Sequence, residues 1–340
     1  MRSEMHTADN EMTDFFELMV ASKSQVARET WAFTFVAADG SPLPAFTPGS
    51  HLTVVTPQGA RRNYSLCGHE SDLMRYQIAI KRDAAGRGGS ISMVDDVKVG
   101  DCLNVSAPRN NFELSSRAKQ FLFIAGGIGI TPILSMMRHL HAIGNEAFKL
   151  FYCTRDAEST AFVDVLQQEF PGQVVIHHDH GDINQAYDFW PLLESPTAAH
   201  VYCCGPKGLM DSVADMSGHW PSGTVHFESF GVDARTFAEN TAFFVQLQKS
   251  GQRVAVSKDQ SILEALRANG HQVRSSCESG TCGTCKTRLI AGEADHRDAR
   301  HPQHRAIVEI ALQREHDVAA EDRCRAEQQD RARHERQQRA

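Results

Sequence analysis

The sequence predicts a multidomain chain in which an antiparallel β-barrel precedes a parallel α/β domain and a small C-terminal domain. Short apolar segments separated by Gly, Pro and Asp fill residues 14–115, which is typical of an antiparallel barrel. From Ser116 to residue 231, strand-like and helix-like segments alternate, as they do in a parallel α/β sheet. A run of closely spaced cysteines marks residues 240–298 as a third unit.

Composition limits the classes of partner and the location of the protein. The 340 residues allow two or three domains, and the net charge of −7 argues against nucleic acid as a partner. The sequence contains no run of about 18 apolar residues, so it predicts no transmembrane helix. The polar, acidic N-terminus lacks the features of a signal peptide, so we expect a cytoplasmic protein. In that reducing compartment the nine cysteines are expected to be buried, catalytic or metal-bound rather than paired.

Within the barrel, the strand RRNYSLCG combines charged, amide, phenol and hydroxyl groups. Alternation places Arg62 and Tyr64 on one face of the strand and Asn63 and Ser65 on the other. The strands expected around it are Thr30–Val36, His51–Thr56, Met74–Ile80 and Asp101–Val105. Together with the next segment, this strand suits a flavin phosphate; ordinary surface charge is the alternative.

That next segment, KRDAAGRGGSIS, is a candidate phosphate cradle. It supplies Lys81 and Arg87, followed by the loop glycines Gly88 and Gly89 before Ser90. Successive backbone amides in such a loop form a concave site for anions.

The α/β domain is expected to contain four strand–helix repeats. Its expected strands are Gln120–Ala125, Phe148–Thr154, Val174–His177 and Ala199–Cys203. The expected helices are Ile133–Ile143, Thr160–Gln168, a helix near Trp190, and Gly208–Ser217.

The motif GGIGITP follows the first of these strands and opens a helix. Gly126, Gly127 and Gly129 would let the backbone approach a pyrophosphate at the helix N-terminus. Thr131 and Pro132 complete the motif. A tight strand–helix turn without a ligand is the alternative.

The motif CCGPKGLM closes the last strand of the same domain. Gly205 and Pro206 predict a sharp turn at a carboxyl strand end, where ligands bind in open α/β sheets. Cys204 would then face a nicotinamide, or serve as a buried structural thiol.

The domain also holds a histidine cluster, which is either a metal site or a solvated strand end: His177, His178 and His180.

The third unit starts with a predicted hairpin, Phe243–Lys249 and Gln252–Val256, and a helix, Ser261–Asn269. The sequence CESGTCGTCKT then has the C-x4-C-x2-C spacing of a plant-type [2Fe–2S] loop. Three thiolates would converge on the cluster from Cys277, Cys282 and Cys285. Chance clustering and a zinc site are the alternatives, although zinc usually takes two separated cysteine pairs.

In this order, RNYSL, GRGGS, GGIGITP, CGP and CESGTCGTC resemble the phthalate dioxygenase reductase family. Its members are reductases of bacterial aromatic-ring dioxygenases and O-demethylases. The resemblance covers about residues 14–298 and implies an FMN-binding Greek-key barrel, an NAD-binding Rossmann-like domain and a β-grasp ferredoxin. It places Arg62, Tyr64 and Ser65 at the FMN ring and ribityl chain. Lys81 and the Arg87–Ser90 loop would lie near the FMN phosphate.

The resemblance also implies positions for the nicotinamide nucleotide. Gly127, Thr131 and Cys204 would line the nicotinamide path, and Phe230 would lie against the flavin. Arg155 would read the adenosine ribose, and the neighbouring acids Asp156 and Glu158 would disfavour a 2′-phosphate, so NADH is expected. The complete set of expected cofactor-binding residues is Arg62, Asn63, Tyr64, Ser65, Lys81, Arg87, Gly88, Gly89, Ser90, Gly126, Gly127, Gly129, Thr131, Pro132, Arg155, Cys204, Gly205, Pro206 and Phe230.

The sequence departs from the family after residue 298. The fourth cysteine expected near Gln313 is absent, and the closing strand of the β-grasp is not recognisable. Residues 299–340 form a charged tail, for which we hypothesise either disorder or a frameshifted reading of the gene. Ile307–Leu312 is expected to start a helix. Cys324 is the remaining candidate for the fourth ligand, with a histidine as another option.

The expected function is that of an NADH-dependent oxidoreductase, the reductase component of a Rieske-type aromatic dioxygenase or demethylase. Hydride would pass from NADH to FMN, and single electrons would pass through [2Fe–2S] to the oxygenase. No catalytic acid or base is required, and a monomer is expected. The alternatives are a flavin-dependent quinone or small-molecule reductase, and an impaired flavoprotein without an intact cluster.

Overall fold

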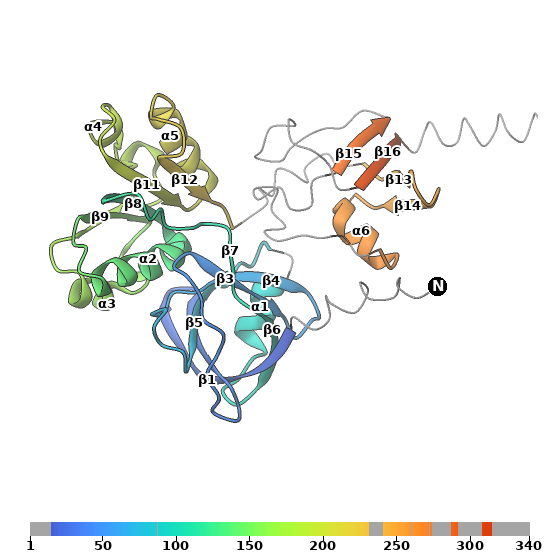
Figure 1. Ribbon diagram of the computed structural model, residues 1–340, viewed down its shortest axis with the longest axis horizontal. Helices are drawn as coiled ribbons and strands as arrows, with labels where there is room; N and C mark the ends of the chain where they lie inside the picture. Colours follow the sequence, from blue (N-terminus) through green and yellow to red (C-terminus); the bar gives the residue numbers. More distant parts are fainter. Residues whose placement is uncertain are drawn as a thin grey trace, which may run out of the picture. The chain divides into compact units, whose positions relative to one another are not determined.

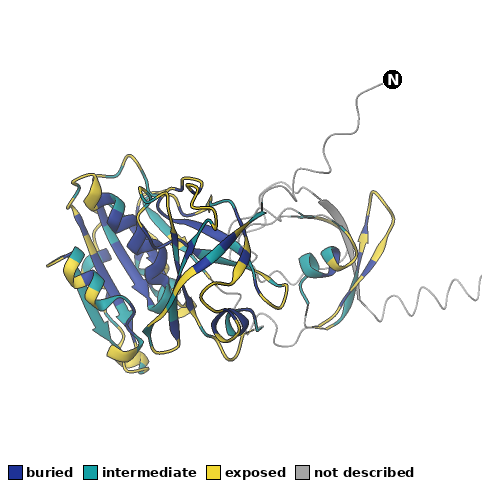
Figure 2. Cartoon of the chain, turned by 90° about the horizontal axis from the view of Figure 1, so that it is seen from below, coloured by how far each residue is buried: buried dark blue, intermediate teal, exposed yellow. Residues whose placement is uncertain are grey.

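The computed structural model describes residues 15–86, 88–230, 241–258, 260–271, 273, 287–291 and 308–314. The chain divides into two compact units, Met1–Phe230 and Gly231–Ala340. The first unit contains an antiparallel sheet followed by a parallel one (Figure 1). Its buried residues concentrate on the strands of both sheets and on the helix faces that cover them (Figure 2). Within the described ranges, no helix has the length and apolar character needed to cross a membrane.

The antiparallel sheet closes into the predicted barrel. Hydrogen-bonded neighbours run in the order β4-β3-β6-β1-β2-β5, with β7 paired to β3. An antiparallel bridge between Leu66 and Ile78 links β5 to the residue that follows β4. Large apolar side chains such as Phe33 and Phe35 fill the interior. The strands are β1 (Phe15–Ala27), β2 (Thr30–Val36), β3 (Ser50–Val55), β4 (Arg61–Ser65), β5 (Tyr76–Lys81), β6 (Cys102–Ser106) and β7 (Arg109–Asn110).

Helix α1 (Gly89–Asp95) packs on the barrel and is held at its C-terminal end by a lysine. The Lys23 ammonium, on β1, donates hydrogen bonds to the carbonyl oxygens of Val94 (2.5 Å) and Val97 (2.8 Å). A cation is favourable there because the last carbonyls of a helix carry partial negative charge. This contact ties the helix, and the glycine loop before it, to the barrel.

The parallel sheet has the order β10-β9-β8-β11-β12. Helices α2 and α3 share one buried cluster with the sheet, and α4 and α5 share another on the opposite face. The predicted alternation is therefore confirmed as a doubly wound sheet. Its strands are β8 (Gln120–Gly126), β9 (Phe148–Thr154), β10 (Val174–His178), β11 (Ala199–Cys204) and β12 (Val225–Glu228). Its helices are α2 (Ile130–Ala142), α3 (Val163–Glu169), α4 (Trp190–Leu193) and α5 (Lys207–Ser217), with short turns η1 (Gly127–Gly129), η2 (Ala157–Ser159) and η3 (Ile183–Gln185).

Buried polar contacts join the barrel to the parallel sheet within the first unit. Arg138, on α2 and 8% exposed, donates to the carbonyl oxygen of Cys67 at 2.7 Å. Its other guanidinium nitrogens form a two-point contact with Glu169 on α3, at 2.7 and 2.8 Å. His139 and Glu70 add a second contact across the same boundary. These bonds connect the two predicted domains, which belong to one compact unit.

Among its described residues, the second unit contains a four-stranded sheet, β14-β13-β16-β15, with one helix packed on it. The predicted hairpin is confirmed: β13 (Phe243–Leu247) and β14 (Arg253–Val256) are antiparallel around Ser250 and Gly251, whose φ is 68°. Helix α6 (Ile262–Ala268) begins at Ser261, which forms a reciprocal capping box with Glu264. The two remaining strands are β15 (Thr287–Ala291) and β16 (Val308–Arg314).

Strand β16 corrects one expectation. From the sequence we expect a helix to start at Ile307–Leu312, within the charged tail; residues 308–314 instead form a strand. This strand pairs antiparallel with β13 and parallel with β15, and two ladders outweigh a weak local preference for helix. The sheet of the second unit therefore extends past residue 298.

Replacing Lys23 by Met should destabilise the first unit, because the two carbonyl oxygens lose a charged donor while the aliphatic stem is retained. We expect urea denaturation of the full chain to show a decrease of about 1–2 kcal/mol in the free energy of unfolding. Lys149→Met, at an exposed position of β9, is the matched control. An equal decrease in both variants would contradict the assigned role.

Candidate functional site

The loops that follow β8 and β11 meet at the point where the sheet reverses its winding. From β8 the chain proceeds through α2 to β9, whereas β11 returns to the opposite side of β8. Ligands of open α/β sheets bind at this switch point, beside the carboxyl ends of the strands. The motifs GGIGITP and CCGP occupy these two ends.

The two motifs are in backbone contact, and side chains are excluded between them. A Cβ atom on Gly129 would lie 2.1 Å from the carbonyl oxygen of Cys204. A Cβ on Gly126 would lie 2.5 Å from Pro206 Cδ, and one on Gly205 would lie 2.9 Å from Gly126 Cα. The glycines are therefore needed for the approach of β8 to β11, whether or not a ligand is bound.

Gly127 differs from these three glycines because its backbone is in the left-handed region, with φ 51°. A Cβ on Gly127 would meet nothing within 4 Å, so this residue borders open space. Its carbonyl oxygen accepts a hydrogen bond from the Tyr152 hydroxyl at 3.0 Å. Thr131 is 1% exposed, and its hydroxyl donates to the Ile128 carbonyl at 3.0 Å, so it stabilises the turn from within. Pro132 is buried in the first turn of α2.

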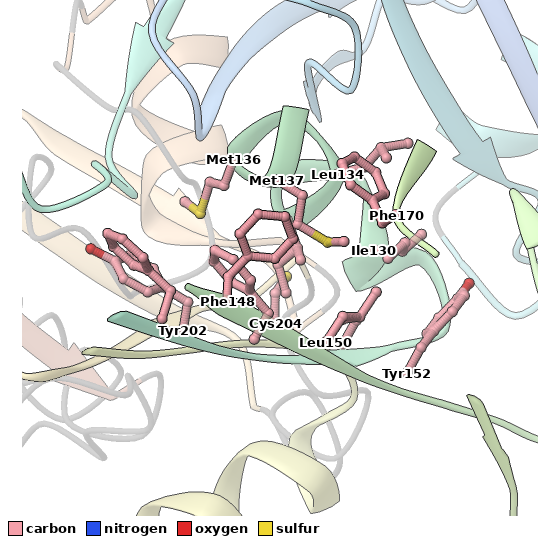
Figure 3. Packing of buried hydrophobic residues seen from close by; sticks show 14 of the residues in the cluster. Ile130, Leu134, Met136, Met137, Phe148, Leu150, Tyr152, Phe170, Tyr202 and Cys204 are labelled. Atoms are coloured by element: carbon pink, nitrogen blue, oxygen red, sulfur yellow. The ribbon is translucent and has the colours of Figure 1, made fainter. Parts of the chain in front are cut away.

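Cys204 ends β11 with its side chain fully buried in the cluster beneath α2 (Figure 3). Burial raises the pKa of its thiol well above the usual value, and the nearby Glu228 carboxylate raises it further. The thiol is thus held protonated. Its backbone carbonyl, rather than its sulfur, is the group that contacts Gly129.

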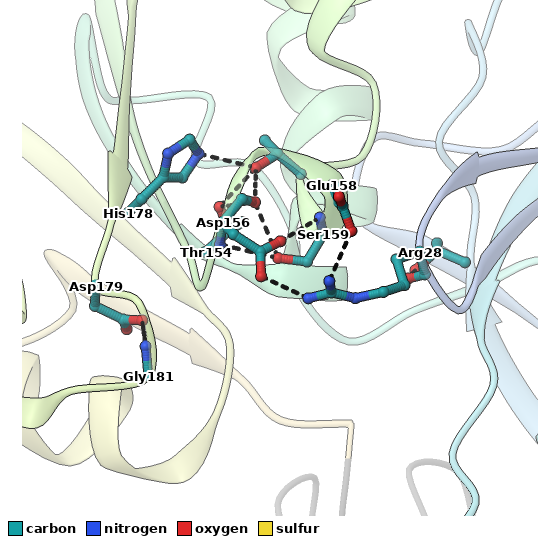
Figure 4. A network of polar contacts seen from close by, with 10 residues as sticks. Arg28, Thr154, Asp156, Glu158, Ser159, His178, Asp179 and Gly181 are labelled. Carbon is teal, nitrogen blue, oxygen red and sulfur yellow. Dashed lines mark hydrogen bonds and ion pairs between the residues drawn. The ribbon is translucent and has the colours of Figure 1, made fainter.

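Two acids after β9, Asp156 and Glu158, form ion pairs with an arginine of the barrel (Figure 4). Arg28, in the β1–β2 turn, donates to Asp156 at 2.5 Å and to Glu158 at 2.8 Å. The hydrogen bond from Arg28 is the main cause of the lowered pKa of Asp156. One positive charge on Arg28 thus offsets part of the negative charge of the two acids, which together keep the net negative charge expected to disfavour a 2′-phosphate. Arg155 beside them is exposed.

In the barrel, two predicted residues of β4 present buried hydroxyls. Within the described part of the chain, neither the Tyr64 hydroxyl nor the Ser65 hydroxyl has a hydrogen-bond partner. Burial raises the pKa of Tyr64, and the Arg62 guanidinium offsets this in part. The side chain of Asn63 already has a protein partner, since its Oδ1 accepts a hydrogen bond from the Thr53 hydroxyl at 2.8 Å. Two buried, unpartnered hydroxyls are the polar groups that a bound ligand would satisfy.

The predicted phosphate loop lies next to this strand. Gly88 has φ 81°, and a Cβ on Gly89 would lie 2.7 Å from Nε of Arg62, so Arg62 and the loop are in direct contact. The Ser90 hydroxyl accepts a hydrogen bond from the Asp83 amide at 3.1 Å, which closes the loop. Lys81 is exposed at the end of β5. Arg87 lies outside the described residues.

The remaining predicted residues are not brought together by the described structure. Phe230 ends the first unit and is 42% exposed. All four candidate iron ligands lie outside the described residues: Cys277, Cys282, Cys285 and Cys324.

The metal interpretation of the histidine cluster receives no support. Among the described residues no group of three or more potential ligands is positioned for a metal ion. The ring of His177 contacts the Gln185 carbonyl at 2.7 Å, and that of His178 contacts the Thr160 hydroxyl at 3.2 Å. The rings of His177 and His178 therefore contact other protein groups, which favours a solvated strand end over a metal site.

Two residues of the site, Arg28 and Tyr152, are not predictable from local sequence patterns. Arg28 carries no local signal, because an arginine in a hairpin turn is usually solvated. Tyr152 carries a weak local signal, because a tyrosine in a buried strand requires a partner for its hydroxyl. Nothing in the local sequence predicts that this partner is Gly127.

The chain is similar to known proteins over most of its length. Residues 123–215 match the family model described as "Oxidoreductase NAD-binding domain", and residues 245–320 match the "2Fe-2S iron-sulfur cluster binding domain". The chain is 54% identical over 313 residues to the phthalate 4,5-dioxygenase oxygenase reductase subunit of Pseudomonas putida, covering 91% of this chain and 97% of that protein. It is 56% identical over 286 residues to the phthalate dioxygenase reductase of Burkholderia cepacia, covering 84% and 89%.

A solved structure extends the comparison to three dimensions. It is a phthalate dioxygenase reductase, described as a modular structure for electron transfer from pyridine nucleotides to [2Fe–2S]. The TM-score is 0.78 at 52% sequence identity, covering 89% of this chain and 98% of that one.

The glycine contact at the switch point predicts a strong effect of a single methyl group. Gly129→Ala places a Cβ against the Cys204 backbone, which cannot rotate away as a side chain would. We expect the free energy of unfolding to fall by about 3 kcal/mol or more in urea denaturation. Gly208→Ala, on α5 with no atom within 4 Å of its added Cβ, is the control and should be neutral or slightly stabilising. Equal stability of the two variants would contradict the close contact.

Proposed function

Because the chain belongs to the phthalate dioxygenase reductase family, we propose that it is the NADH-dependent reductase component of a Rieske-type aromatic dioxygenase or demethylase. It would use FMN and a [2Fe–2S] cluster to pass electrons from NADH to the oxygenase. The observation that carries the proposal is the position of both glycine motifs at the switch point of the parallel sheet, where Gly127 borders open space. We place the nucleotide there, on a sheet that polar contacts join to the barrel.

The barrel residues fit a flavin. Tyr64 and Ser65 have buried hydroxyls without partners among the described residues, and Arg62 lies against the Gly88–Gly89 loop. Arg62, Tyr64 and Ser65 would hold the ring and ribityl chain, and the glycine loop would hold the phosphate. When bound, FMN supplies the chemistry that converts a two-electron hydride donor into single electrons.

The α/β domain would bind and orient NADH. The loop from Gly126 to Gly129 leads into α2, whose positive N-terminal end suits a pyrophosphate. Arg155, exposed after β9, would contact the adenosine ribose. Arg28 holds the adjacent acids, which fixes this loop relative to the barrel. No side chain needs to act as a general acid or base.

The proposal extends to the partner and its location. Relatives are reductase subunits of oxygenases, which supports an oxygenase as the electron acceptor. A Rieske centre in that oxygenase and a monomeric reductase are part of the proposal. So is a cytoplasmic location, which agrees with the five described cysteines being unpaired.

Tyr64→Phe should have opposite effects on the flavin-free and flavin-bound protein. Removing a buried hydroxyl without a partner should raise the unfolding free energy of the flavin-free protein by about 1 kcal/mol. If that hydroxyl bonds FMN, the Kd for FMN should rise about tenfold, measured by fluorescence titration. Tyr76→Phe is the control: its hydroxyl donates to the Pro44 carbonyl, so its loss should lower stability and spare FMN affinity. An unchanged Kd in Tyr64→Phe would exclude this contact.

The iron–sulfur assignment is tested by Cys282→Ser, with the exposed barrel cysteine variant Cys102→Ser as control. We expect NADH to reduce the flavin in both variants, whereas electron transfer to cytochrome c, a one-electron acceptor, is lost only in Cys282→Ser. Iron and sulfide analysis should show a cluster in the wild type and in Cys102→Ser.

Three outcomes separate the alternatives. Flavin without iron in the wild type would support the impaired flavoprotein. Full NADH oxidation with a quinone, and none with any oxygenase, would support the small-molecule reductase. Loss of the cluster in Cys324→Ser would identify the fourth ligand.

A further inference from the structure

Tyr152 makes two hydrogen bonds that connect the loops at the carboxyl edge of the parallel sheet. It lies on β9 next to β8, is fully buried, and pairs in register with Ala125. Its hydroxyl donates to the Gly127 carbonyl at 3.0 Å and accepts from the Ala161 amide at 3.2 Å. One oxygen therefore links the loop after β8 to the loop before α3.

The first of these loops needs an external restraint. Glycine adopts left- and right-handed conformations about equally, so the sequence GGIGI alone does not select one conformation. Gly127 is left-handed and borders open space, where no packed side chain could restrain it. The Tyr152 hydroxyl fixes the direction of the Gly127 carbonyl, and hence the peptide that follows it.

The second loop is itself restrained from the barrel. Ala161 follows η2, which contains Glu158 and is capped by Asp156, and both acids are held by Arg28. The Arg28 amide also donates to the Glu158 carbonyl at 2.7 Å. Tyr152 thus transmits to Gly127 a position that is set, in part, by the barrel.

We propose that Tyr152 is a positioning residue for NADH, one that holds Gly127 in the conformation that accepts the dinucleotide. This inference rests on the proposed function. Because Tyr152 is fully buried, it acts through Gly127 and does not contact the nucleotide. Its removal should therefore weaken NADH binding more than it slows hydride transfer from bound NADH.

Tyr152→Phe removes the hydroxyl and preserves the packing of the ring. In NADH-dependent reduction of cytochrome c by the full chain, we expect KM for NADH to rise at least about fivefold, with kcat within about twofold of the wild type. The Kd for NAD⁺, measured by calorimetry, should rise by a similar factor.

Tyr202→Phe is a closely matched control. Tyr202 is also fully buried, and its hydroxyl also donates to one backbone carbonyl, that of Glu113 (3.1 Å), and accepts from one amide, that of Ser115 (2.7 Å). The two tyrosines lie at opposite ends of the same buried cluster (Figure 3). Tyr202→Phe should cost comparable stability in urea denaturation and leave KM for NADH unchanged.

The outcomes distinguish the proposals. An unchanged KM in Tyr152→Phe, or an equal rise in both variants, would overturn the role of Tyr152. Absence of NADH oxidation by the wild type would overturn the proposed function instead. If Tyr152→Phe does not fold, Gly127→Ala tests the same requirement, because its added Cβ has space but disfavours the left-handed backbone; an unchanged KM there would also overturn the proposal.

Discussion

The approach of two backbones at the end of the parallel sheet is the constraint on which the first unit depends. The Cys204–Gly205 peptide lies so close to Gly129 and Gly126 that no Cβ fits between them. This contact sets the spacing of β8 and β11 at their carboxyl ends and the direction in which α2 leaves the sheet. Gly127, between Gly126 and Gly129, differs because its added Cβ would meet nothing within 4 Å. Close packing and open space therefore lie side by side in this one loop.

Rigid connection of the barrel to this sheet is the second requirement. A reductase that passes hydride between a nucleotide on one domain and a flavin on another needs a fixed distance between them. Two arginines contribute to it at different places on the boundary. Arg138 joins α2 and α3 to the Cys67 carbonyl of the barrel, and Arg28 joins the barrel hairpin to the acids after β9. The planar, always charged guanidinium suits both positions because it bonds several acceptors at once.

Parts of the site were predictable from sequence because they depend on local chemistry. The glycines after Ala125 and the Gly-Pro turn after Cys204 are required by strand–turn–helix geometry, and the structure places them together. Arg28 and Tyr152 were not predictable in this way. Their partners, Asp156 and Gly127, are distant in sequence, and only the folded chain brings the groups into contact.

By itself, the sequence determined the order of the domains, the two glycine motifs and the cysteine spacing, because each is encoded in residues a few positions apart. It also predicted strands and helices whose periodic apolar residues face a core. The tertiary structure alone decided that residues 308–314 form a strand, since the two neighbouring strands that stabilise β16 lie elsewhere in the chain. It decided as well that the hydroxyls of Tyr64 and Ser65 are buried without partners among the described residues, and that Tyr152 holds the Gly127 loop. Such contacts follow from how sheets pack and pair, and no local pattern records them.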